Sequence, residues 1–135
     1  MKAFIDTNVL LRFFAQDDAR QSAQAEELLA AARRGEVELV CGPPVLFEVA
    51  WTLRGSYGRS RLQVLDTLQS LLAFPGLKMT DKGLAAEALR LARANGMEFA
   101  DAYIAATALE SGIKLATFNV KDFKGCGVPL RPWTT

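Results

Sequence analysis

Ala3-Phe4-Ile5-Asp6-Thr7-Asn8-Val9-Leu10-Leu11 is a short apolar run followed at once by helix-capping residues and a second apolar run. Residues 3–5 predict a buried strand, because a short apolar run bounded by polar residues is typical of strands covered on both faces. Asp6-Thr7-Asn8 predicts the end of that strand and the start of a short helix over residues 9–14. A strand leading directly into a helix is the repeating unit of α/β proteins.

The same unit recurs along the chain. Further strands are predicted at 37–41, 77–80 and 113–117, with an edge strand at 128–130. Further helices are predicted at 19–34, 45–54, 60–73, 81–94 and 99–111. Strands that alternate with helices, without two-residue hairpin turns, favour parallel strands joined by crossover helices. The sequence therefore predicts an α/β fold with a central, mainly parallel sheet of four to five strands, whose ligands bind outside the carboxyl ends of the strands.

The length of 135 residues is that of one domain, and no linker or repeat divides it, so a single domain over residues 1–135 is predicted. The chain contains no histidine. This excludes Ser-His-Asp and Cys-His catalysis and histidine-based zinc sites. The 16 basic and 15 acidic residues leave a net charge of +1, which gives no support for a cationic protein that coats DNA.

Cys41 and Cys126 are not arranged as C-x-x-C, and we interpret both as small buried hydrophobic residues. The stretch MKAFIDTNVL is too short and becomes acidic too soon for a signal peptide. No apolar run reaches the roughly 18 residues of a membrane span. These features predict a reduced, cytoplasmic protein that does not cross a membrane.

Because histidine is absent, catalysis is left to carboxylates, Lys, Tyr, Ser, Thr or a bound metal. Two acidic residues in the first half of the chain are unusually placed. Asp6 follows the first strand directly, where it could also be a helix N-cap. Glu48 lies in the apolar stretch Val45-Leu46-Phe47-Glu48-Val49-Ala50-Trp51, where a buried carboxylate needs a partner. That partner could be a metal, or an arginine such as Arg54 or Arg12.

Two acidic residues in the second half are also unusual. Asp101 shares a helical stripe with the small residues Ala105, Ala108 and Gly112, although it could simply be a first-turn acid that interacts with the helix dipole. Asp122 follows the predicted fourth strand by a few residues, where a turn or cap role is nearly as plausible as a functional one.

The four acids are predicted to converge at one edge of the sheet, where the strands end and the following helices begin. Converging carboxylates repel one another unless a cation lies between them. Oxygen ligands without His or Cys suit Mg²⁺ or Mn²⁺ best. Such a site supports metal-assisted attack of water on a phosphodiester.

Four stretches carry a recognisable pattern in a fixed order: Phe4-Ile5-Asp6-Thr7-Asn8-Val9-Leu10-Leu11, Val45-Leu46-Phe47-Glu48-Val49, Phe99-Ala100-Asp101-Ala102-Tyr103-Ile104-Ala105-Ala106-Thr107-Ala108 and Leu115-Ala116-Thr117-Phe118-Asn119-Val120-Lys121-Asp122-Phe123. Together they resemble the PIN-domain family, and more narrowly the VapC-type ribonuclease toxins of bacterial and archaeal toxin–antitoxin pairs. The resemblance covers essentially the whole chain.

The resemblance implies a three-layer α/β/α sandwich with a parallel sheet, Mg²⁺- or Mn²⁺-dependent cleavage of RNA, a homodimer and inhibition by a small antitoxin. It implies a metal-binding role for Asp6, Glu48 and Asp101. It also places Thr7, Asn8 and Thr117 near the site as polar support.

One position departs from the family pattern. Many relatives carry a further aspartate two residues after the threonine that ends the fourth strand, where this chain has Asn119. Asn119 could ligate weakly or hold a metal-bound water, and Asp122 could supply the missing charge or cap a turn. One firm metal site, with a second completed by the RNA phosphate, is therefore the expectation.

A local basic cluster includes one aromatic residue: Arg54-Gly55-Ser56-Tyr57-Gly58-Arg59-Ser60-Arg61. Arg54, Arg59 and Arg61 could contact RNA phosphates, with Tyr57 stacking on an unpaired base. A solvated loop is an equally good interpretation, and a contact with the antitoxin is a third.

The sequence thus favours a metal-dependent endoribonuclease in which Asp6, Glu48, Asp101 and Asp122 are the candidate catalytic acids and a metal-bound water is the nucleophile. One alternative is a catalytically weak or inactive PIN-fold module that binds RNA or protein. A second is a phosphatase with Asp6 as the nucleophile, but Asp6-Thr7-Asn8 lacks the D-x-D arrangement of aspartyl-phosphate enzymes.

Overall fold

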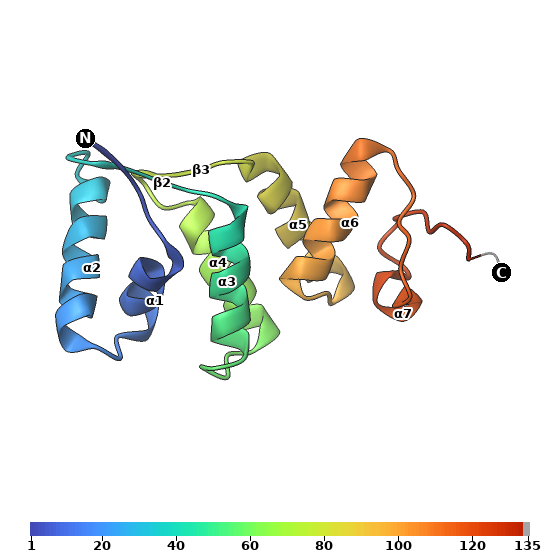
Figure 1. Ribbon diagram of the computed structural model, residues 1–135, viewed down its shortest axis with the longest axis horizontal. Coiled ribbons are helices and arrows are strands. Elements are labelled where there is room, and N and C mark those ends of the chain that lie inside the picture. The colour runs from blue at the N-terminus through green and yellow to red at the C-terminus, as the bar shows by residue number, and fades with distance from the viewer. Residues whose placement is uncertain (134–135) are drawn as a thin grey trace. The chain divides into compact units, whose positions relative to one another are not determined.

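The computed structural model describes residues 1–133 of the chain (Figure 1). The chain separates into two compact units, Met1–Lys82 and Gly83–Thr135, the second described as far as Trp133.

The first unit contains a parallel sheet of three strands: β1 (Lys2–Phe4), β2 (Glu38–Cys41) and β3 (Leu77–Met79). The strands lie in the order β1-β2-β3, with Ala3 opposite Leu39 and Leu39 opposite Leu77 (Figure 1). Four helices connect them: α1 (Thr7–Ala15), α2 (Ala19–Arg33), α3 (Pro43–Arg54) and α4 (Arg61–Leu72). The predicted α/β class with a parallel sheet is confirmed.

The helices of this unit begin where local signals predict them to begin. The side chain of Asp18 accepts a hydrogen bond from the backbone N–H of Gln21 and caps α2. Ser60 and Gln63 form a reciprocal capping box at the start of α4. Pro43, in the first turn of α3, has no N–H that would need a partner.

The core of the first unit is built from leucines on every layer. Leu10, Leu29, Leu39, Leu46 and Leu68 are fully buried and come from α1, α2, β2, α3 and α4 respectively. Burying one such side chain contributes roughly 1.5–3 kcal/mol to folding. The central strand β2 is therefore well covered.

The first strand is less buried than its apolar sequence predicts. Ile5 is 3% exposed, but Phe4 is 68% exposed. Phe4 lies opposite Val40, which lies opposite Lys78, and this face of the sheet is less covered than the face that carries the buried Leu77 and Met79. The strand forms one residue earlier than predicted, and the prediction of burial is confirmed for Ile5 but wrong for Phe4.

The second unit is helical. It contains α5 (Lys82–Asn95), α6 (Phe99–Ser111) and the short α7 (Val120–Phe123). Helix α6 ends at Gly112, which adopts a left-handed conformation with φ of 67° as a C-terminal glycine should. Many of the buried residues of the second unit are small, among them Ala88 on α5 and Ala102 and Ala105 on α6.

The predicted strand at 113–117 does not form. Leu115 and Leu130 make a single parallel bridge, in which the Leu115 N–H donates to the Pro129 carbonyl and the Arg131 N–H donates to the Leu115 carbonyl. Leu130 lies in the stretch 128–130 that was predicted as an edge strand, and only this one bridge forms there. Because Pro129 has no N–H to donate and the Ile113 N–H donates to the Ala108 carbonyl, the pairing does not continue toward Ile113. The sheet of the described residues has three strands, instead of the four to five predicted.

Cys41 and Cys126 are buried and unbonded to each other, in agreement with their interpretation as small hydrophobic residues. Burial raises the pKa of the Cys41 thiol to about 11, so this thiol stays protonated at neutral pH. Among residues 1–133, no helix combines the length and the apolar character that crossing a membrane requires.

Gly76 precedes β3 and is expected to be the glycine least tolerant of substitution. It has a φ of 88°, and an added Cβ would overlap the carbonyl group of Ala32. Gly76→Ala should lower the free energy of unfolding by at least about 2 kcal/mol, measured by urea denaturation.

The matched control for this prediction is Gly35→Ala. Gly35 has a similar φ of 83° but nothing within 4 Å of an added Cβ. It should therefore lose only the roughly 1–2 kcal/mol that the backbone conformation costs a residue with a side chain. Equal losses in the two variants would show that the clash with Ala32 does not exist.

Candidate functional site

Asp6 lies between β1 and α1, where the sequence places it, and it caps the helix. Its Oδ1 atom accepts hydrogen bonds from the backbone N–H groups of Asn8 at 3.1 Å and Val9 at 3.4 Å. The residue is exposed, and Oδ2 has no hydrogen-bond partner within residues 1–133. The capping role is therefore observed, and one carboxylate oxygen is left for another ligand.

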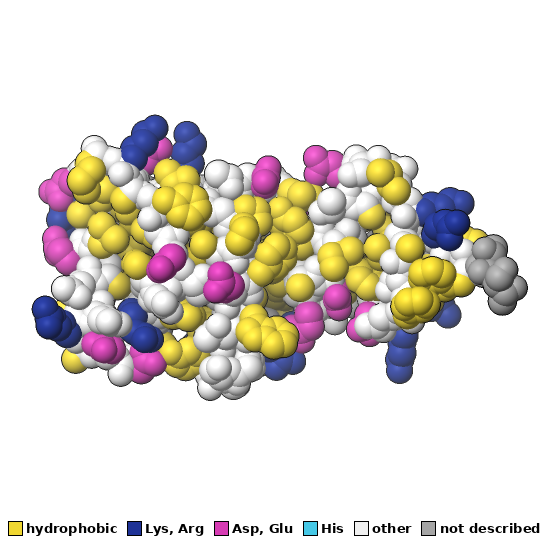
Figure 2. All heavy atoms as spheres, in the orientation of Figure 1, with side chains coloured by type: hydrophobic (Ala, Val, Ile, Leu, Met, Phe, Trp, Pro, Cys, Tyr) yellow, Lys and Arg dark blue, Asp and Glu magenta, His cyan; other side chains and the backbone are white. Residues whose placement is uncertain are grey.

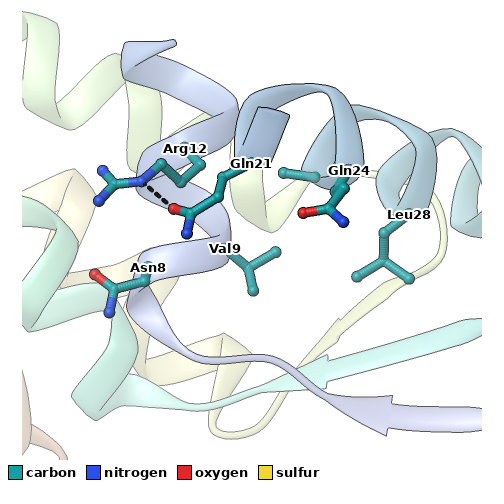
Figure 3. A pocket seen from close by; sticks show the side chains of 7 residues that line it. Asn8, Val9, Arg12, Gln21, Gln24 and Leu28 are labelled. Carbon is teal, nitrogen blue, oxygen red and sulfur yellow. Dashed lines mark hydrogen bonds between the residues drawn. The ribbon is translucent and has the colours of Figure 1, made fainter. Parts of the chain in front are cut away.

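The two polar residues after Asp6 are placed differently. Thr7 is buried, with 8% of its surface exposed, whereas Asn8 is exposed. Asn8 and Val9 line a pocket of about 310 Å³ together with residues of α2 (Figure 3). Within this pocket, the Arg12 guanidinium donates to Oε1 of Gln21 at 2.7 Å. The predicted supporting residue Asn8 thus lines a pocket whose wall contains both polar and apolar side chains.

Glu48 lies on α3 but is exposed, which corrects the expectation of a buried carboxylate. The helix turns Val45, Val49 and Leu53 toward the core, so that Glu48 and the 81% exposed Trp51 lie on the other side. Glu48 forms no ion pair or hydrogen bond with another residue of the described chain. Its carboxylate is thus not committed to Arg12 or Arg54.

Asp101 lies in the first turn of α6 and is partly buried. Burial raises the pKa of its carboxyl group, and the nearby negative charges of Asp122 and Glu98 raise it further. The N-terminal end of a helix favours a negative charge, but these two effects outweigh it here. Burial and the two neighbouring acids thus disfavour the ionised form of the Asp101 carboxyl group.

Asp122 and Asn119 form one hydrogen-bonded group with Thr117. The Asn119 side-chain amide donates to Oδ2 of Asp122 at 2.6 Å, and the Asn119 backbone N–H donates to Oγ1 of Thr117 at 2.9 Å. Asn119 also precedes α7 as its N-cap residue, but without a side-chain capping bond. The three residues around the predicted departure from the family pattern are thus mutually connected, with the amide nitrogen of Asn119 turned toward Asp122.

The four candidate acids are divided between the two units. Asp6 and Glu48 belong to the first, and Asp101 and Asp122 belong to the second. Within the part of the chain that the structure describes, no three His, Cys, Asp or Glu side chains lie close enough together to hold one metal ion. The convergence of all four acids at one edge stays a prediction.

The basic cluster at 54–61 is anchored by a side-chain network that the sequence did not predict. The Tyr57 hydroxyl donates to Oδ2 of Asp17 at 2.7 Å, and Arg12 pairs with Oδ1 of Asp17 at 3.1 Å. The hydrogen bond from Tyr57 lowers the pKa of Asp17 and raises that of Tyr57. The Arg54 side chain also donates to the Arg59 carbonyl at 3.3 Å. Tyr57 is thus held by its hydroxyl.

A pair of stacked aromatic rings beside Thr117 was also missed. Phe118 lies against Trp133 with ring centroids 4.4 Å apart and an interplanar angle of 7°. The two residues belong to segments with no shared periodicity, and Phe118 was noted only as part of a longer motif. The available signal was an aromatic residue that lies next to a predicted site and belongs to no periodic pattern of core-facing residues.

A comparison with known protein families agrees with the sequence pattern. The family model described as PIN domain matches residues 3–125. A solved toxin–antitoxin complex from Klebsiella pneumoniae is similar, with 21% sequence identity, a TM-score of 0.37, and coverage of 98% of this chain and 99% of that one. No curated protein matches the chain.

Proposed function

The chain belongs to the PIN-domain family, and on this premise we propose that it is a Mg²⁺- or Mn²⁺-dependent endoribonuclease. PIN domains are generally nucleases, which supports the hydrolysis of phosphodiester bonds. The family match crosses the boundary between the two compact units. This supports the proposal that residues 1–135 act as a single nuclease domain.

The environment of Asp101 carries the proposal of a metal cofactor. Its carboxyl group is partly buried, and burial together with the charges of Asp122 and Glu98 raises its pKa. A divalent cation would relieve this repulsion, because a cation near a carboxylate favours its ionised form. Asp6 and Glu48 have carboxylate oxygens that no cation of the described chain neutralises. Oxygen donors of this kind fit Mg²⁺ or Mn²⁺.

We propose the following roles for the chain's own residues. Asp6, Glu48 and Asp101 hold the metal, and Asp6 is oriented for this by its bonds to the start of α1. Asn119 contributes weakly, and Asp122 is positioned by Asn119. When bound, the ion supplies an activated water and stabilises negative charge on the phosphate. Thr7, Asn8 and Thr117 act as polar support.

The biological setting is proposed from the same sequence motifs. The VapC-like pattern favours a toxin with a small cognate antitoxin, a homodimeric state and a cytoplasmic location. Arg54, Tyr57, Arg59 and Arg61 are candidates for contacts with RNA or with the antitoxin. A short reading frame encoding a small protein directly upstream of the gene would support the toxin assignment.

The activity is tested by incubating purified protein with single-stranded RNA. Cleavage at internal positions is expected with Mg²⁺ or Mn²⁺, and an excess of EDTA should abolish it. Adding back either ion should restore it. Absence of cleavage by antitoxin-free protein with both ions would contradict the proposal.

A second candidate function is a PIN-fold module that binds RNA without cutting it. The observation that favours it is Asn119, whose amide nitrogen faces Asp122 where many relatives have another carboxylate. RNA binding that is saturable and unaffected by metal, without any cleavage, would favour this function over the first.

A further inference from the structure

The second unit exposes a pair of aromatic rings in an ordered arrangement. Phe118 and Trp133 stack nearly parallel, 4.4 Å apart. The indole N–H of Trp133 donates to the carbonyl of Thr117 at 2.9 Å, which fixes the indole ring next to the chain segment that carries Phe118. The pair is thus held in position before any ligand binds.

Both rings are exposed to an unusual degree for large aromatic residues. Phe118 is 88% exposed and Trp133 is 52% exposed. Since Trp133 covers one face of Phe118, the other face of the Phe118 ring lies open to solvent. An exposed, flat and fixed aromatic surface is suited to stacking with another planar group.

The chain around the pair is positively charged. From Gly112 to Trp133 it carries four basic residues, Lys114, Lys121, Lys124 and Arg131, against one acidic residue, Asp122. All four basic side chains are exposed and form no ion pair with another described residue. Figure 2 shows basic side chains beside hydrophobic ones close to the C-terminal end of the described chain.

We propose that Phe118 and Trp133 form a stacking platform for an unpaired base of single-stranded RNA, with the surrounding lysines and arginine contacting its phosphates. Aromatic rings combined with basic side chains are how proteins bind single-stranded nucleic acid. This inference rests on the proposed function, since it names how the substrate is held. The platform adjoins Thr117, Asn119 and Asp122, so that a base stacked there would bring its phosphates toward these residues.

Single-stranded RNA fits this surface better than a protein partner does. A peptide segment would require apolar pockets for its side chains, whereas here a flat ring face is bordered by uncompensated positive charge. Paired RNA is also unfavoured, because its bases are not available for stacking. The occupant is therefore an unpaired base with its flanking phosphates.

The intrinsic fluorescence of Trp133 tests the platform directly. The chain has two tryptophans, so Trp51→Phe leaves Trp133 as the only one. This protein is titrated in EDTA with an oligouridylate about ten nucleotides long, so that binding is measured without cleavage. We expect saturable quenching of Trp133. In this background, Phe118→Leu should weaken binding roughly 5- to 150-fold, the range measured for loss of one base–aromatic stack.

Three further variants separate stacking from other effects. Phe118→Tyr keeps the ring and should bind like the parent. Trp133→Ala, followed by the anisotropy of a fluorescein-labelled RNA, should weaken binding to a similar extent as Phe118→Leu. Lys121→Gln should reduce the salt dependence of binding by one phosphate contact, a slope change of about 0.7, whereas Phe118→Leu should leave that slope unchanged. Circular dichroism confirms that each variant is folded.

Two results would overturn the inference. One is tight RNA binding in which neither Phe118→Leu nor Trp133→Ala changes the Kd. The other is no quenching of Trp133 by RNA together with a change of oligomeric state in Trp133→Ala, which would make the pair a protein interface. Neither outcome bears on cleavage. RNA cleavage that survives both substitutions contradicts the platform alone, and RNA binding through the platform without cleavage contradicts the proposed nuclease alone.

Discussion

Asp6→Asn is expected to reduce metal-dependent RNA cleavage by at least about a hundredfold while leaving the protein folded. The substitution removes the negative charge that is proposed to hold the ion, and metal stabilisation of developing charge is worth several kcal/mol, with 1.36 kcal/mol for each factor of ten. Asparagine caps a helix as well as aspartate does, so the bonds to the start of α1 can be kept. The cleavage rate and the melting temperature are measured on the same preparation.

The chain offers a matched control in Asp18→Asn. Asp18 caps α2 just as Asp6 caps α1, through a 2.9 Å hydrogen bond from the Gln21 N–H. It has no proposed role in metal binding. The two variants should have similar melting temperatures, and only Asp6→Asn should lose cleavage. Equal cleavage by both variants would mean that Asp6 is only a cap.

Asp101→Asn is expected to lose cleavage to a similar extent and, in the absence of metal, to become more stable. The raised pKa of Asp101 means that the folded protein holds its proton more tightly than the unfolded chain does. Stability from this group is therefore present below the ordinary value of 3.8 and is lost as the pH rises through the raised pKa. Asparagine carries no charge and avoids this loss.

The measurement is the melting temperature in EDTA across the pH range. The variant should melt above the wild type at neutral pH, and the difference should shrink as the pH falls toward 4 and below. Glu110→Gln is the control, because Glu110 lies exposed on the same helix and has no proposed role. A variant that is less stable than wild type at neutral pH would show that Asp101 is a favourable first-turn acid instead.

Local signals predict most of the helices. Helix α6 covers Phe99–Ser111 as expected, and α2 begins at Ala19 and ends one residue before the predicted end. Both depend on a few neighbouring residues, such as Asp18 and Gly112, whose effect is exerted within one turn. The strands at 38–41 and 77–79 were found for a similar reason, since short apolar runs bounded by breakers have few alternatives.

The sequence indicates which acidic residues are candidates for the site, but it does not predict how buried each side chain is. Asp6 follows β1 and caps α1, as the sequence indicated. Glu48 was expected to be buried because its neighbours are apolar, yet the structure exposes both Glu48 and Trp51. Apolar neighbours along a helix cannot tell which side meets the core, because that depends on which elements pack against it.

The order of the residues alone thus determined the available chemistry and most helix boundaries. The chemistry follows from the absence of histidine and from the acids after apolar runs, and the boundaries follow from the caps and glycines at helix ends. Folding added relations between distant segments. It left Phe4 exposed on one face of the sheet, limited the pairing of Leu115 and Leu130 to one bridge, and joined Tyr57 to Asp17 and Phe118 to Trp133. No local pattern encodes such contacts, because their free energy depends on how the whole chain excludes water and satisfies its polar groups.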